Sequence, residues 1–135
     1  MQGWSVQNNT DLPIFRAFAD MPGRVQVFAE AMTFHAMLPG YSTQSLVDQF
    51  PWGSDKKLTV VDVGGSLGHV SLALAAHHPT VQCIVEDLPN VIGQAQQGLP
   101  AAFRDRISFQ AHDFFNEQPV KGADVYLLRL VLHDW

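Results

Sequence analysis

The fold is decided by residues 58–68, which read Leu-Thr-Val-Val-Asp-Val-Gly-Gly-Ser-Leu-Gly. The β-branched and aliphatic side chains of residues 58–63 are typical of a strand that is buried on both faces. The three glycines that follow let the backbone turn tightly and approach a ligand closely before a helix begins. The stretch therefore predicts a parallel α/β sheet with a glycine loop at its carboxyl edge.

Beyond this loop, helical and strand-like segments alternate. The pattern predicts helices over residues 70–78 and 90–97 and further strands over 81–86, 107–111 and 125–132. Strands that alternate with helices at this spacing form parallel sheets joined by right-handed crossovers. We therefore expect an α/β fold with a Rossmann-like parallel-sheet core that occupies residues 58–135.

The first fifty residues are helical in character. Apolar side chains recur at helical spacing on two faces of one segment, which is opened by the breakers of residues 20–23 and closed by Pro39. Such a helix needs cover, and either the rest of the chain or a partner chain could supply it. The breakers and charges of residues 51–57 predict a boundary. The expected domains are thus a helical segment over 1–52 and the α/β core over 58–135.

Composition excludes several classes of function. The 135-residue chain is 47% hydrophobic with a formal net charge of −5, and its basic residues are scattered singly, which disfavours a nucleic-acid partner. No export signal or membrane span is indicated, and we expect no metal site, because no cluster of residues stands at metal-ligand spacing. The single cysteine, Cys83, falls in an expected buried strand. This use of cysteine indicates a reducing, cytoplasmic location.

Polar side chains follow each expected strand, at the edge where parallel sheets bind ligands. Asp62 ends the first strand, and Asp87 follows the second, where a carboxylate can accept both hydroxyls of a ribose or cap the next helix. Asp113 and Phe114 follow the third strand and offer a carboxylate to an exocyclic amine and a ring to a flat base, or serve as a loop acid and a core aromatic. His133 follows the fourth strand and is placed for proton transfer.

The glycine spacing argues against a dinucleotide cofactor. Residues 64–69 supply only one glycine of the G-x-G-x-x-G fingerprint. A nicotinamide-dependent oxidoreductase is therefore disfavoured. A plain strand-to-helix turn is the remaining structural alternative for the loop.

With these residues assembled, the sequence resembles the class I S-adenosylmethionine-dependent O-methyltransferases of the caffeate and flavonoid type, particularly their fungal secondary-metabolite relatives. The resemblance spans most of the chain. It rests on Phe50-Pro51-Trp52, on Val61-Asp62-Val63-Gly64-Gly65 with Gly68, on Val85-Glu86-Asp87-Leu88-Pro89, on His112-Asp113-Phe114-Phe115 and on residues 129–135, Arg-Leu-Val-Leu-His-Asp-Trp. Several motifs in the family's order make the resemblance specific.

The resemblance implies that S-adenosylmethionine is the cofactor. The loop of Gly64 and Gly65 would hold its methionine part, Asp87 its ribose, and Asp113 with Phe114 its adenine. Two further positions depart from the plant members of the family. Arg129 stands near the cofactor where plant relatives usually have lysine, and Ser66 replaces a glycine that is common in plant members.

The resemblance also implies an activity. His133 matches the family's general base, and an imidazole that removes the proton of a phenol as the methyl bond forms lowers the barrier of transfer. The expected substrate is a small aromatic phenol, no metal is needed, and the full-length form is expected to be a homodimer. Family members start earlier and continue past the His-Asp-Trp motif, so we expect a truncated form with little activity. A catalytically inactive cofactor-binding interaction protein is the alternative.

Overall fold

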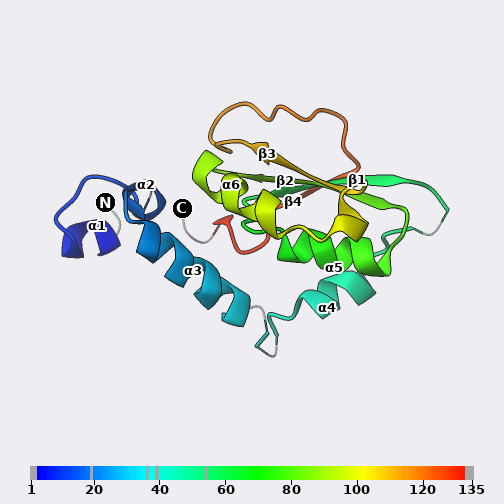
Figure 1. The fold of residues 1–135 in the computed structure, drawn as a ribbon, viewed down its shortest axis with the longest axis horizontal. Helices are drawn as coiled ribbons and strands as arrows, with labels where there is room; N and C mark the ends of the chain where they lie inside the picture. Colours follow the sequence, from blue (N-terminus) through cyan, green and yellow to red (C-terminus); the bar gives the residue numbers. More distant parts are fainter. Residues whose placement is uncertain (1–2, 19, 36, 39, 54, 133–135) are drawn as a thin grey trace. The chain divides into compact units, whose positions relative to one another are not determined.

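The structure is a computed structural model that describes residues 3–18, 20–35, 37–38, 40–53 and 55–132. The chain divides into two compact units, Met1–His35 and Ala36–Trp135. Figure 1 shows the helices and strands of both units. In the part of the chain that the structure describes, we find no helix with the length and apolar character needed to cross a bilayer.

The first unit consists of helices. They are α1 (Gly3–Gln7), α2 (Ile14–Phe18) and α3 (Pro22–His35). Aromatic rings hold them together: Phe15 and Phe28 lie edge to face with centroids 5.1 Å apart, and Trp4 meets Phe18 in the same manner at 5.7 Å. Edge-to-face pairs of this kind add to the energy of apolar burial. The helix predicted between the breakers of residues 20–23 and Pro39 is confirmed by α3.

The second unit contains the parallel sheet. Its elements are α4 (Thr43–Gln49), β1 (Leu58–Val63), α5 (His69–His77), β2 (Val81–Asp87), α6 (Pro89–Gly98), the short 3-10 helix η1 (Ala101–Phe103), β3 (Ile107–Ala111) and β4 (Val125–Leu127). The strand order is β3-β2-β1-β4, and every neighbouring pair is parallel. The predicted α/β fold and the order of its elements are confirmed. Strand β4 is shorter than expected, since Leu130 adopts a left-handed backbone with φ 55° soon after it.

The handedness of the crossovers decides what covers each face of the sheet. From β1 through α5 to β2, and from β2 through α6 to β3, the chain steps in one direction, so right-handed crossovers place both helices on the same face. The step from β3 to β4 runs the other way and passes over the opposite face. Residues 112–124 make this connection without a helix, as the long loop beside the sheet in Figure 1 shows.

The core lies between the sheet and α5, and α4 extends it. Val60, Cys83 and Leu74 are among the fully buried side chains. Trp52 is also buried, and its indole nitrogen donates to the carbonyl oxygen of Leu46 at 3.0 Å. The region just before β1 therefore packs on the α/β unit, whereas the sequence grouped residues up to 52 with the helical segment. The free energy gained by burying the large Trp52 ring keeps this segment on the α/β unit, although residues 51–57 contain the breakers that suggested a domain boundary.

Candidate functional site

The carboxyl ends of the first three strands meet at one edge, as the sequence predicts for a parallel sheet. Val63 at the end of β1 is in register with Glu86 on β2, and Asp87 is in register with Ala111 on β3. The glycine loop after β1, the carboxylate after β2 and the turn after β3 are therefore neighbours. The structure thus brings Gly64, Gly65 and Asp87 to the same edge.

Two glycines of the loop are required by its path. Gly64 has φ 70°, and its amide donates to the Glu86 carbonyl oxygen at 2.8 Å, while the Gly65 amide donates to the same oxygen at 3.1 Å. A Cβ at Gly65 would lie 2.7 Å from Cγ of Asp62, and one at Gly64 would lie 2.9 Å from Cγ2 of Val131. Real Cβ atoms do not approach other atoms so closely, so both positions exclude larger residues.

The next residue of the loop, Ser66, connects it to Asp87. Ser66 has φ 53°, in the left-handed region that favours glycine. Its amide donates to Oδ2 of Asp87 at 2.8 Å, and the Leu88 amide donates to Oδ1 at 2.7 Å. Each carboxylate oxygen can accept a further bond. Asp87 therefore fixes the loop and retains acceptor capacity for a ribose. The capping interpretation is wrong, because the N-cap residue of α6 is Leu88 and no side chain caps this helix.

Burial raises the pKa of the Asp87 carboxyl, and the two backbone bonds oppose that rise. A bound ligand that donates hydrogen bonds to the carboxylate would favour its ionised form in the same way. The position of Asp87 is thus suited to accept donors from a neutral, hydroxyl-bearing group.

Asp62 is a buried acid in β1, two residues before Gly64. Its side chain is 2% exposed, and Oδ2 accepts a bond from the Ser71 hydroxyl at 2.8 Å. Burial raises the pKa of Asp62 to about 6; the bond from Ser71 lowers it, the Asp87 carboxylate raises it further, and the positive charge of Arg129 lowers it. The bond from Ser71 connects Asp62 near the end of β1 to helix α5, so it stabilises the two elements that flank the glycine loop.

Arg129 follows the end of β4 by two residues, and its positive charge lowers the pKa of Asp62. Its guanidinium also donates to the carbonyl oxygen of Tyr41, which precedes α4 in the same unit. A cation at this edge could neutralise a ligand carboxylate. The predicted role of Arg129 beside a cofactor stays a prediction.

Asp113 and Phe114 occupy a turn after β3. The Asp113 carboxylate accepts from the Phe115 amide at 3.2 Å, and its carbonyl oxygen accepts from the Asn116 amide at 2.8 Å. The rings of Phe114 and Phe115 pack with centroids 4.7 Å apart. Phe114 lines an open hollow of about 440 Å³ whose walls also include Val63, His112, Gln118, Val120, Lys121, Gly122, Tyr126 and Leu128.

His133 lies outside the described residues. The chain that leads toward it is described as far as Leu132, and Val131 is buried with its side chain against Gly64. Val131 therefore connects the segment after β4 to the glycine loop. Within the described ranges, no group of three or more His, Cys, Asp and Glu side chains could hold a metal ion.

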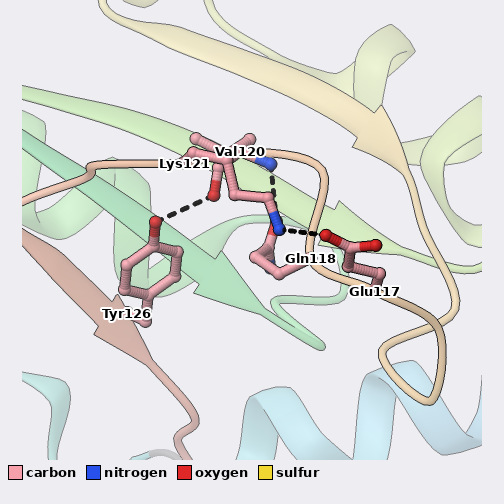
Figure 2. Close-up of polar contacts among 5 residues, drawn as sticks. All are labelled: Glu117, Gln118, Val120, Lys121 and Tyr126. Carbon is pink, nitrogen blue, oxygen red and sulfur yellow. Dashed lines mark hydrogen bonds and ion pairs between the residues drawn. The ribbon is translucent and has the colours of Figure 1, made fainter.

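Sequence reasoning missed the contacts that hold the 112–124 connection. Glu86 is 1% exposed, and Oε2 accepts from the side-chain amide of Gln118 at 2.8 Å. Gln118 Oε1 in turn accepts from the Val120 amide at 2.9 Å, and the Tyr126 hydroxyl donates to the Val120 carbonyl at 2.8 Å, as Figure 2 shows. The available signal was the period of two along β2, which sets Glu86 on the face opposite Cys83 and Val85.

Comparison with known proteins identifies one family across the chain. Residues 5–135 match the family model of the O-methyltransferase domain. The chain is 45% identical over 131 residues to the O-methyltransferase VdtC of Byssochlamys spectabilis, covering 93% of the chain and 30% of that protein. It is 43% identical over 136 residues to the Grayanic acid biosynthesis cluster O-methyltransferase of Cladonia grayi, covering 99% of the chain and 30% of that protein. The chain thus spans less than a third of the length of these relatives.

Solved structures of an O-methyltransferase have the same fold over most of the chain. The chain superimposes on the O-methyltransferase NcsB1 from neocarzinostatin biosynthesis with a TM-score of 0.83 and 27% identity, covering 98% of the chain and 38% of NcsB1. That structure is a complex with S-adenosyl-L-homocysteine and 1,4-dihydroxy-2-naphthoic acid. A second structure of NcsB1 contains S-adenosylmethionine and 2-hydroxy-5-methyl naphthoic acid, and the chain matches it with a TM-score of 0.79.

Proposed function

The chain belongs to the O-methyltransferase domain family, and on that premise we propose that it binds S-adenosylmethionine and takes part in methyl transfer to a small aromatic metabolite. The observation that carries the proposal is the bond of 2.8 Å from the Ser66 amide to Asp87. This bond shows that the glycine loop and the carboxylate are in direct contact. The sequence alone showed only that each follows a strand.

The described residues fit the parts of this cofactor. Its methionine end needs close approach to the backbone, which the loop of Gly64 and Gly65 provides. Its ribose offers two hydroxyl donors, and Asp87 retains acceptor capacity on both oxygens. Its adenine is a flat aromatic ring system with an amine at one edge, which suits the Phe114 ring and the Asp113 carboxylate. We propose that these residues hold the cofactor.

When bound, S-adenosylmethionine supplies a methyl group on a positively charged sulfur, which an oxygen nucleophile attacks in line. The contribution of this chain would be to orient the cofactor and to remove a proton from the acceptor. We propose His133 for the second task, because it follows Val131 by two residues in the sequence and the Val131 side chain lies against Gly64. A positioned general base contributes roughly two to four orders of magnitude in rate.

The proposed acceptor is a phenolic hydroxyl. NcsB1 binds hydroxylated naphthoic acids, and this precedent supports an aromatic acceptor for the present chain. A homodimer in the full-length form, a cytoplasmic location and the lack of a nucleic-acid partner remain proposals from the sequence. The negative net charge of −5 supports the last of these.

Methyl transfer to a panel of phenols tests the activity in the protein as its gene encodes it. His133→Ala should lower kcat by at least a hundredfold and leave S-adenosylmethionine affinity within twofold, as expected for a group that acts in the transition state. His77→Ala is the matched control, since this histidine is exposed at the end of α5. Full activity of His133→Ala would refute the base assignment, and absence of transfer by the wild type would favour the inactive cofactor-binding alternative.

A further inference from the structure

Glu86 is an unusual residue to find buried at the end of a strand. Its side chain is 1% exposed, and Oε1 has no hydrogen-bond partner among the described residues. A buried carboxylate with an unsatisfied oxygen costs stability, and an apolar side chain of similar size would often be tolerated better. The residue therefore calls for an explanation other than stability of the core.

The contacts of Glu86 reach both halves of the proposed cofactor site. Its carbonyl oxygen accepts the amides of Gly64 and Gly65 at 2.8 and 3.1 Å. Its Oε2 accepts a hydrogen bond of 2.8 Å from the side-chain amide of Gln118, which lies in the 112–124 connection. One residue thus contacts the glycine loop through its backbone and the 112–124 connection through its side chain, and Asp87 follows it directly.

The 112–124 connection depends on such contacts because it has no helix of its own. It begins beside β2, where the His112 amide donates to the Asp87 carbonyl at 2.9 Å, and then carries Asp113 and Phe114. Gln118 links its middle to β2, and the Tyr126 hydroxyl holds the Val120 carbonyl from β4. The bond between the Gln118 side-chain amide and Glu86 therefore fastens the middle of this loop to β2.

We propose that Glu86 is a positioning residue of the cofactor site, which sets the place of Asp113 and Phe114 through its bond to Gln118. The proposal rests on the proposed function, since Asp113 and Phe114 are assigned there to the adenine. Glu86 itself touches no ligand in this proposal. It acts on affinity by holding the loop in the conformation that binds.

Reversal of the pair tests the proposal. Gln118→Glu sets two carboxylates against each other, so the loop should separate from β2. Glu86→Gln keeps an acceptor for Gln118 and should resemble the wild type. In the double variant Glu86→Gln with Gln118→Glu, the amide of residue 86 can donate to the carboxylate of residue 118, so the bond is restored with opposite polarity. Glu117→Gln is the matched control, because it breaks only the exposed pair with Lys121 that Figure 2 shows.

Two measurements are made on the protein as its gene encodes it. Amide hydrogen exchange over residues 112–124, without cofactor, reports the loop; calorimetric titration with S-adenosylmethionine reports the site. Gln118→Glu should speed exchange and weaken binding at least fivefold, and the reversed pair should return both to within twofold of the wild type. The control should change neither quantity.

The outcomes separate the two proposals. Unchanged exchange and affinity in Gln118→Glu, or no recovery in the reversed pair, would overturn the role of Glu86. Failure of the wild type to bind S-adenosylmethionine would instead overturn the proposed function, and the exchange data would still decide whether Glu86 holds the loop. Normal affinity with a released loop would show that the loop does not position the site, which also overturns the proposal.

Discussion

Substitution of Gly65 by alanine should destabilise the protein although it adds a single methyl group. The new Cβ would lie 2.7 Å from Cγ of Asp62 and 2.9 Å from its carbonyl oxygen. Neither atom can move freely, because the carbonyl belongs to β1 and the carboxyl is buried and bonded to Ser71. Overpacking of this kind costs about 1–3 kcal/mol. We expect a loss of that size in the free energy of unfolding.

The matched control is Gly93→Ala in the middle of α6. A Cβ there would meet no atom within 4 Å, and no left-handed backbone is recorded at this position. Alanine in an exposed helix should therefore stabilise the protein by about 0.5–1 kcal/mol. Both variants are measured by urea denaturation followed by circular dichroism. If Gly65→Ala were as stable as the wild type, the close packing of the glycine loop against Asp62 would be refuted.

Two further predictions concern buried side chains. The pKa of Asp62 is raised from 3.8 to about 6, so between these pH values the folded state holds a proton that the unfolded state has lost; stability should fall as pH rises through this window. Relative to Asp62→Asn, the wild type should lose about 2 kcal/mol between pH 4 and pH 6, and parallel denaturation profiles of the two would contradict this. Trp52→Ala should cost about 3–5 kcal/mol and Trp52→Phe about 1–2 kcal/mol for the lost bond to Leu46; a Trp52→Phe variant as stable as the wild type in chemical denaturation would show that the indole bond contributes nothing.

The sequence predicted the parallel sheet well because its signals are local. The β-branched run of β1 and the glycines after it specify a buried strand and a tight turn without reference to distant residues. Asp87 was predicted for the same reason, since it directly follows a strand whose end was clear. Strand β4 was predicted too long, because Leu130 adopts a left-handed backbone and Val131 lies against Gly64, so the chain does not continue the strand.

The remaining features depend on contacts between distant residues. No local pattern indicates that Gln118 bonds to Glu86 or that Arg129 meets the carbonyl of Tyr41. The place of α4 was also decided at a distance, by burial of Trp52 in the second unit. Side-chain bonds of this kind become visible only when the register of the sheet is known.

The central claim is that Asp87 and the glycine loop form one site for S-adenosylmethionine. Calorimetric titration of the wild type, Asp87→Ala and the exposed control Asp105→Ala tests it most directly. A carboxylate that accepts ribose hydroxyls contributes about 1.5–3 kcal/mol for each bond. Asp87→Ala should therefore bind S-adenosylmethionine at least tenfold more weakly, and Asp105→Ala should bind like the wild type. Equal affinity of Asp87→Ala and the wild type, or tighter binding of a nicotinamide dinucleotide by the wild type, would contradict the claim.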